Sequence, residues 1–291
     1  MGKSSIKDRL FNLGGTFPAP LKRVVKYSYY TATLGRKEKD WLILNTIPKS
    51  GTMYFMMFMA NYFRLVYEDA DDRTSYHEMQ NVLFPNERAR YIRTGRLEPP
   101  HPIMANSPFS DFLFCHQTTF LEYFNGKLVF LYRNPLDLII SSYFYFWRLQ
   151  PKKAEIYSHP REVADRYLTD FIAKYSFMRA WAKRKPNFLC LSYETMKRAP
   201  FEMFTMVVLR LGLPLDIPKL RRAVEFSSFD ASRKEELENG PIHPPTKDYQ
   251  GFFTRSGEIG QWKEFFDDAD LKRIWSRLEA AGIQRSEFIL E

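Results

Sequence analysis

The stretch WLILNTIPKSGTMY at residues 41–54 decides the expected fold. The apolar run that opens it is short enough for a buried strand, and Pro48 and Gly51 interrupt it. The mainly apolar run from Phe55 to Tyr67 that follows has the length of a helix and contains no helix breaker. We therefore expect a strand, a loop and a helix, in that order.

A strand-to-helix loop of this kind suits an anion, because backbone N–H groups and the positive end of the helix dipole converge on one point. Lys49 adds a full positive charge, and Ser50 and Thr52 add hydroxyl groups. Thr52 could equally cap the helix. A Walker A motif is excluded, since that motif has a further glycine before Gly-Lys-[Ser/Thr], and here the lysine precedes Gly51. We interpret the loop as a phosphate or sulfate site, with an ordinary turn as the alternative.

The length and composition favour a single domain over residues 1–291, because the chain is 45% hydrophobic and no linker-like stretch divides it. A net charge of +9 favours an anionic ligand, although a nucleic acid or an acidic membrane surface would explain it equally well. Cys115 and Cys190 lie in apolar runs without metal-ligand spacing, so we expect reduced core thiols and no metal. The N-terminus lacks the apolar region of a signal peptide, and no apolar stretch is long enough for a membrane span. We expect a cytoplasmic protein.

Three further strands are expected, at Phe112–His116, Lys127–Tyr132 and Phe188–Tyr193. They alternate with helix candidates at 135–147, 162–184 and 200–212. This alternation predicts a parallel sheet with helices on both faces, and such sheets bind ligands at the carboxyl ends of their strands. The expected strand ends carry Lys49, His116, Arg133 and Tyr193.

The residues at two of these strand ends are candidates for catalysis or ligand binding. His116 is well placed to face a cleft, and a hydrogen-bonded structural histidine is the alternative. Arg133, with Ser141 two helical turns further on, could hold a phosphate dianion, because the planar guanidinium donates two parallel hydrogen bonds. The alternative pairs Arg133 with Asp137 across the start of the helix.

The remaining segments are less regular. Residues 1–40 mix basic and aromatic residues without a period, and we expect them to pack on the body as an N-terminal extension. Residues 230–261 form the longest expected irregular stretch, and their basic residues and glycines favour a lid loop over 234–261. A last helix is expected from Asp267 to Ala281.

These stretches together resemble the cytosolic-type sulfotransferases, which transfer a sulfuryl group from 3′-phosphoadenosine 5′-phosphosulfate (PAPS) to an acceptor and release PAP. Residues 48–52 resemble the family's 5′-phosphosulfate loop, residues 132–141 its 3′-phosphate motif, and residues 255–263 (RSGEIGQWK) its C-terminal signature. The resemblance implies a P-loop-like parallel sheet flanked by helices. It also implies a small-molecule acceptor with a hydroxyl or amine. We expect no nucleic-acid partner and no membrane span.

The resemblance also implies roles for individual residues. His116 matches the catalytic base, and Lys49 and Ser141 are the other catalytic candidates. The nucleotide would contact Lys49, Ser50, Gly51, Thr52, Met53, Tyr54, Arg133, Ser141, Tyr193, Ser227, Phe229, Arg255, Ser256 and Gly257. Within this set, residues 49–52 would hold the 5′-phosphosulfate, Arg133 and Ser141 the 3′-phosphate with help from Arg255 and Gly257, and Tyr54 and Phe229 would flank the adenine.

The chain departs from the family pattern at several positions. Met53 and Tyr54 stand where Thr-Trp is usual, Phe114 where many members have lysine, and Ser256 where lysine or arginine is frequent. The residues after Trp262-Lys263 do not match the family's dimerisation motif.

Two other classes of protein fit the sequence less well than a sulfotransferase. A nucleotide kinase would need a Walker A loop and an acidic magnesium ligand at a strand end, and neither is present. A non-catalytic binder of nucleic acid or membrane would concentrate basic and aromatic residues on one element, and no element shows this.

Overall fold

The computed structural model describes residues 41–76, 78–79, 106–109, 111–116, 118, 121, 126–148, 156–185, 188–240, 252 and 254–290. The expected N-terminal extension at 1–40 lies outside these residues. All statements below concern the described part of the chain.

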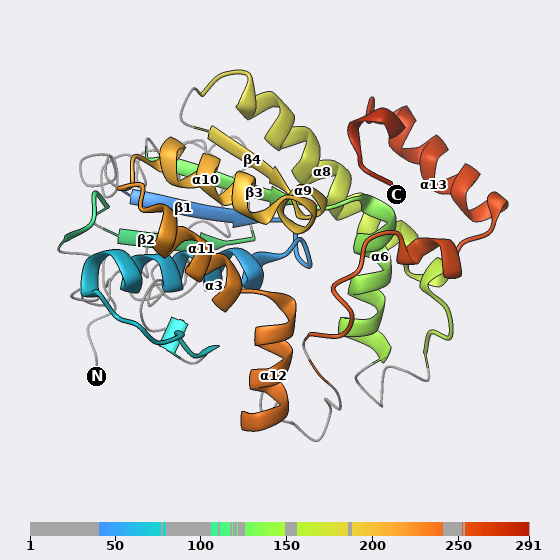
Figure 1. Ribbon diagram of the computed structural model, residues 1–291. Coiled ribbons are helices and arrows are strands. Elements are labelled where there is room, and N and C mark those ends of the chain that lie inside the picture. The colour runs from blue at the N-terminus through green and yellow to red at the C-terminus, as the bar shows by residue number, and fades with distance from the viewer. Residues whose placement is uncertain are drawn as a thin grey trace, which may run out of the picture.

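The four expected strands form one parallel sheet in the order β2-β1-β3-β4 (Figure 1). They are β1 (Trp41–Thr46), β2 (Asp111–Cys115), β3 (Lys127–Tyr132) and β4 (Phe188–Ser192). Every residue of β1 is buried, as expected for a central strand of a sheet covered on both faces. The predicted α/β architecture is confirmed.

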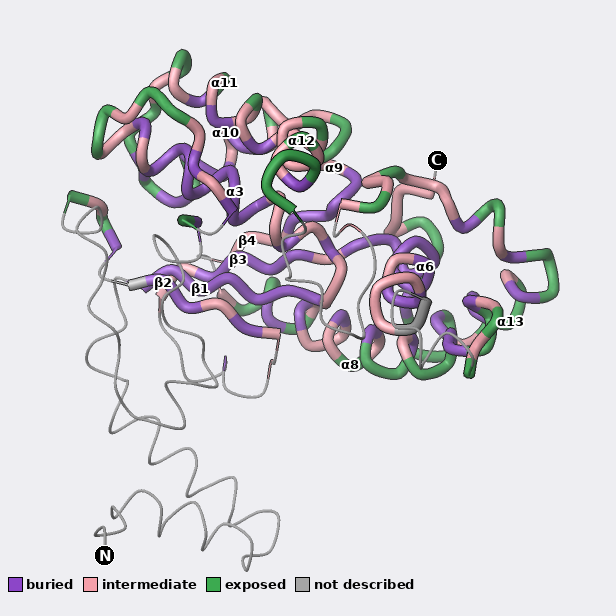
Figure 2. Tube along the Cα trace, turned by 90° about the horizontal axis from the view of Figure 1, so that it is seen from below, coloured by how far each residue is buried: buried purple, intermediate pink, exposed green. Residues whose placement is uncertain are grey.

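Helices cover both faces of the sheet, as Figure 2 shows from the side. Leu42 and Leu44 of β1 pack with α3 (Thr52–Phe63), α10 (Pro200–Leu211) and α11 (Ile217–Phe226). Trp41 and Ile43, on the opposite face, pack with Trp181 of α8 (Ala164–Ala182). This alternation follows from the two-residue period of a strand.

Helices α3 and α6 each follow a strand and carry several of the site residues. α3 packs on α10 through Phe58 and Phe204, whose stacked ring centroids are 3.7 Å apart. Burial of one such ring contributes about 1.5–3 kcal/mol, so the pair fixes the helix behind the first loop. α6 (Pro135–Tyr143) is capped by Asn134, whose side chain accepts from the Leu136 N–H at 2.9 Å. α3 and α6 continue as π-helical turns, at Arg64–Glu68 and Phe144–Arg148 respectively.

The C-terminal part contains α13 (Asp268–Ala280), which packs with α6 and α8. Three short 3-10 turns lie at Pro160–Glu162, Gln261–Glu264 and Arg285–Glu287. Neither Cys115 nor Cys190 is in a disulfide, as expected. None of the helices in the described ranges has the length and apolarity that a membrane crossing requires.

The interpretation of residues 230–261 as irregular is wrong for its first part. Phe229–Asn239 form helix α12, which begins where the Ser228 hydroxyl accepts from the Ala231 N–H at 3.2 Å. Residues 234–239 of the expected lid therefore belong to a helix. Residues 241–251 lie outside the described chain, so the lid remains a prediction for them.

Candidate active site

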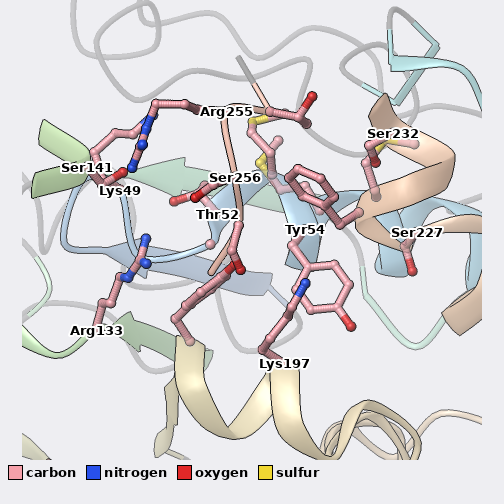
Figure 3. A pocket seen from close by; sticks show the side chains of 18 of the residues that line it. Lys49, Thr52, Tyr54, Arg133, Ser141, Lys197, Ser227, Ser232, Arg255 and Ser256 are labelled. Atoms are coloured by element: carbon pink, nitrogen blue, oxygen red, sulfur yellow. The ribbon is translucent and has the colours of Figure 1, made fainter. Parts of the chain in front are cut away.

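A cavity of about 720 Å³ lies at the carboxyl ends of the strands, between the β1–α3 loop, α6, α12 and the segment after residue 254. In Figure 3, Lys49, Arg133, Ser141 and Arg255 lie toward one end of it, and Ser227 and Ser232 toward the other. Fourteen of the fifteen predicted site residues line it: Lys49, Gly51, Thr52, Met53, Tyr54, His116, Arg133, Ser141, Tyr193, Ser227, Phe229, Arg255, Ser256 and Gly257.

The exception is Ser50, which is fully buried behind the loop. Its hydroxyl has no hydrogen-bond partner among the described residues, and its N–H donates to the Ile47 carbonyl at 3.2 Å. A ligand role for Ser50 stays a prediction.

The β1–α3 loop has the shape expected of an anion cradle. Lys49 and Gly51 both have positive φ, of 69° and 82°. A Cβ at position 51 would come within 2.6 Å of the Tyr193 ring, so this position requires glycine. The N-cap of α3 is Gly51, and the Thr52 hydroxyl donates to Thr46 Oγ1 at 2.9 Å. The alternative in which Thr52 caps the helix is therefore wrong.

Lys49 lies in a buried, positively charged setting. Its Nζ is 3.8 Å from the centroid of the Tyr145 ring. Burial, followed by repulsion from Arg133 and Arg255, lowers the pKa of Lys49 to about 7, while Glu236 acts in the opposite direction. Three cationic side chains thus converge at this end of the cavity, and a bound anion would stabilise the charged form of Lys49.

Arg133 leaves the end of β3 and is almost fully buried. Its Cζ lies 4.3 Å from the Tyr193 ring centroid, and its Nη2 donates to the Glu258 carbonyl at 2.7 Å. Its Nε has no hydrogen-bond partner within the described part of the chain. That Nε lies 4.0 Å from the buried Glu194 carboxylate, an ion pair without a hydrogen bond. A buried guanidinium that lines the cavity is suited to bind an anionic ligand.

The alternative that pairs Arg133 with Asp137 is present as an ion pair, but Nη2 and Oδ2 are 4.0 Å apart, too far for a hydrogen bond. The Asp137 carboxylate instead accepts from the backbone N–H groups of Gly260 at 2.7 Å and Trp262 at 3.2 Å. Both belong to the RSGEIGQWK stretch at 255–263, here called the signature segment.

The signature segment closes one side of the cavity. Its Arg255 lies over the Phe144 ring, with Cζ 4.3 Å from the centroid, and hydrogen-bonds Gln261. Gly257 has a φ of +64°, and a Cβ there would come within 2.5 Å of the Phe229 ring. The Gly257 carbonyl accepts from the Tyr193 hydroxyl at 2.6 Å. The segment is therefore closely packed against the ends of β3 and β4.

His116 follows β2 and faces the same cavity. Its Nδ1 lies 2.9 Å from Thr46 Oγ1 and 3.1 Å from the Thr46 carbonyl oxygen. Because a carbonyl oxygen can only accept, we assign the ring proton to Nδ1, and this tautomer leaves the lone pair on Nε2. The Phe114 ring stands nearly perpendicular to the imidazole, with centroids 4.8 Å apart. An apolar ring thus borders His116 where many family members would place lysine.

Several lining residues were not predicted, among them Tyr145, Lys197, Ser232 and Thr254. Lys197 lies in α9 (Tyr193–Arg198), with Nζ 5.2 Å from the Phe229 ring centroid. Its spacing of four residues from Tyr193 places both on one helical face, so recognising this short helix would have indicated Lys197. In the described part of the chain, no group of three or more His, Cys, Asp or Glu side chains is arranged to hold a metal ion.

The fold, with Lys49, Arg133 and Arg255 together at the ends of the strands, is typical of a P-loop-like α/β protein that binds an anion there. The sequence matches the sulfotransferase domain model over residues 39–281. The chain therefore belongs to the sulfotransferase family, and the predicted class of PAPS-dependent enzyme is confirmed.

Individual relatives agree with this membership. The chain is 28% identical over 250 residues to sulfotransferase 2A6 of Rattus norvegicus, covering 79% of this chain and 80% of the relative. It is 25% identical over 260 residues to the 3-beta-hydroxysteroid sulfotransferase of Cavia porcellus, covering 82% of each.

Solved structures show the same fold. A retinol dehydratase in complex with androsterone and the inactive cofactor PAP has a TM-score of 0.56 at 19% identity, covering 88% of this chain and 84% of that one. The mouse sulfotransferase SULT7A1 complexed with PAP also has a TM-score of 0.56, at 16% identity, covering 87% and 86%.

Proposed function

We propose that the protein transfers the sulfuryl group of PAPS in line to a hydroxyl or amine of a small molecule, with His116 as the general base. The observation that carries this proposal is that His116 and Lys49 line one cavity, with His116 Nδ1 held at Thr46. In this tautomer Nε2 can take the acceptor's proton, and such a positioned base contributes about 10²–10⁴-fold to a rate.

The other residues would hold the donor. The backbone of residues 49–52 would bind the 5′-phosphosulfate, and Arg133 and Ser141 the 3′-phosphate with Arg255 and Gly257. PAPS supplies the sulfuryl group and leaves as PAP. Lys49 would offset negative charge on the bridging oxygen, and the loop N–H groups would hold the sulfuryl oxygens. Tyr54 and Phe229, which both line the cavity, would flank the adenine.

An apolar acceptor with an aliphatic hydroxyl fits the rest of the cavity. Apart from the residues assigned to the nucleotide, the lining includes the apolar side chains of Met56, Met57, Phe114 and Phe146. One relative is by name a hydroxysteroid sulfotransferase, and the retinol dehydratase structure contains androsterone. We therefore propose a hydroxysteroid-like or other apolar alcohol as the acceptor class.

Calorimetric titration with PAP, ATP and single-stranded DNA tests the donor part of this proposal. We expect PAP to bind much more tightly than ATP, since only PAP carries the 3′-phosphate that Arg133 would bind. Preference for ATP would favour a kinase, and preference for DNA a nucleic-acid binder. Transfer of labelled sulfate from PAPS to a panel of apolar alcohols and amines would then identify the acceptor.

A further inference from the structure

Asp137 lies in the first turn of α6 and is 1% exposed. It does not line the cavity. Its two carboxylate oxygens accept separately, Oδ2 from the Gly260 N–H at 2.7 Å and Oδ1 from the Trp262 N–H at 3.2 Å. Hydrogen bonds from backbone N–H groups to a buried carboxylate are charge-assisted and about twice as strong as neutral ones. Asp137 therefore ties α6 firmly to the signature segment.

The signature segment is held at two further points. The Tyr193 hydroxyl donates to the Gly257 carbonyl at 2.6 Å, and Arg133 Nη2 donates to the Glu258 carbonyl at 2.7 Å. Tyr193 and Arg133 both line the cavity, so a ligand there can alter their contacts. Asp137 is outside the cavity, and its contacts can persist whether or not a ligand is bound.

The spacing of Asp137 explains why this contact matters to the site. Arg133, Asp137 and Ser141 follow one another at intervals of four residues, from the end of β3 along α6. Asp137 and Ser141, which are both in α6, therefore lie on one side of the helix, and Arg133 directly precedes its N-cap residue. Asp137 thus stands between the two residues that would bind the 3′-phosphate from the α6 side. Its carboxylate also holds the signature segment, and that segment contributes Arg255 and Gly257 on the opposite side of the proposed phosphate site.

We propose that Asp137 is a positioning residue for the donor's 3′-phosphate, which it serves by fixing the signature segment against α6. The inference rests on the proposed function, since it assumes that Arg133, Ser141, Arg255 and Gly257 bind that phosphate. Asp137 is also a counter-charge to Arg133, with Nη2 and Oδ2 4.0 Å apart. That role alone predicts the opposite result, because removing a negative charge from the site would favour a bound anion.

The substitution Asp137→Asn tests the inference. The shape is kept, but the amide nitrogen would face one of the two N–H groups, so one hydrogen bond is replaced by donor–donor contact. We expect PAP affinity to fall about 10- to 100-fold, the usual effect of losing a hydrogen bond to a charged group, while adenosine 5′-monophosphate binds as before. In kinetics, KM for PAPS should rise more than kcat falls.

Asp216→Asn is the matched control. Asp216 also accepts a backbone N–H, that of Lys219 at 3.0 Å, but at the start of α11 and outside the cavity lining. This variant should keep the affinities of both nucleotides. If Asp137→Asn weakens both nucleotides equally, or weakens neither, the positioning role is wrong.

Hydrogen exchange of the unaltered protein tests the inference even if Asp137→Asn does not fold. The amides of Gly260 and Trp262 should be protected without nucleotide, because Asp137 already holds them, whereas those of residues 255–257 should gain protection with PAP. Rapid exchange at both Gly260 and Trp262 would contradict the inference.

Arg133→Ala separates a failure of the inference from a failure of the proposed function. If Arg133→Ala loses the preference for PAP over adenosine 5′-monophosphate and Asp137→Asn keeps it, the 3′-phosphate site stands and Asp137 has no part in it. If Arg133→Ala keeps the preference, the 3′-phosphate site itself is wrong, and the role of Asp137 falls with it.

Discussion

The ammonium group of Lys49 lies over the aromatic face of Tyr145, with Nζ 3.8 Å from the ring centroid. This cation–π contact stabilises the charged form of Lys49. Burial and the nearby charges of Arg133 and Arg255 act in the opposite direction and lower the pKa of Lys49 to about 7. The charge on Lys49 is therefore set by its neighbours, and it is poised to change near neutral pH.

Donor binding should be coupled to proton uptake by Lys49. In the free protein Lys49 loses its proton as the pH rises through about 7, whereas phosphate and sulfate groups favour its ammonium form. Below that pH the charge is already present. Above it, PAP binding must take up close to one proton, so the affinity should fall by up to about tenfold per pH unit.

Calorimetry at about pH 8.5, in buffers of different ionisation enthalpy, would measure this proton uptake. At this pH an ordinary histidine is neutral and does not contribute. Lys49→Arg is the control, because arginine keeps its charge and should show no uptake. If the heat of PAP binding to the unaltered protein is the same in all buffers, the lowered pKa of Lys49 is wrong.

Tyr145→Leu should lower the pKa of Lys49 further, because the ring no longer stabilises the ammonium group. A cation–π contact contributes about 0.5–2 kcal/mol, which corresponds to roughly 0.4–1.5 pH units. The alkaline fall in PAP affinity should begin at a correspondingly lower pH, and Tyr145→Phe, which keeps the ring, should leave it in place. Equal shifts in both variants would assign the effect to the hydroxyl.

Arg133→Ala should weaken PAP binding by about 2–4 kcal/mol, because a charge-assisted fork to a phosphate dianion is lost. Adenosine 5′-monophosphate should be almost unaffected. The two titrations are compared at one salt concentration, since ion-pair strength depends on screening. Equal weakening of both nucleotides would place Arg133 away from the 3′-phosphate.

Gly257→Ala should displace the Phe229 ring, which a Cβ would approach to 2.5 Å. If Phe229 flanks the adenine, PAP and adenosine 5′-monophosphate should both bind more weakly by about 1–3 kcal/mol, because of backbone strain and the displaced ring. Loss of the proposed 3′-phosphate contact of Gly257 would instead weaken PAP alone. Gly282→Ala is the control, because Gly282 also has a positive φ, of 72°, but nothing lies within 4 Å of its Cβ position. Gly282→Ala should lose some stability and keep its PAP affinity. If Gly257→Ala and Gly282→Ala lose the same amount of PAP affinity, the proposed role of Phe229 is wrong.

The sequence predicts the sheet well because each strand is a short apolar run bounded by breakers. Helix α11 was not predicted, although Asp216 caps it and Leu220 and Ala223 form its buried side. Helix α12 was interpreted as loop because Phe229–Asn239 has no apolar stripe, and only Glu236 is buried among its residues. A helix held mainly by polar contacts gives little periodic signal.

The motifs predicted which residues meet at the cavity but not how they contact one another. Asp137 and Gly260 are far apart in the chain, and their hydrogen bond depends on where β3 and the signature segment come together. The Lys49–Tyr145 contact likewise joins the β1–α3 loop to the π-helical turn after α6. Periodicity and spacing describe single elements, so such contacts follow only from the packed structure.

The role of His116 is tested most directly by transfer of labelled sulfate from PAPS to an aliphatic alcohol, in the unaltered protein and in His116→Ala. An alcohol is used because it stays protonated near neutral pH, whereas an acidic phenol ionises without a base. We expect the turnover of His116→Ala to fall by about 10²-fold or more, with PAP affinity and melting temperature retained. A structural histidine would instead lose stability and affinity together. Transfer at the unaltered rate, in a His116→Ala protein that melts and binds PAP normally, would contradict the proposed base.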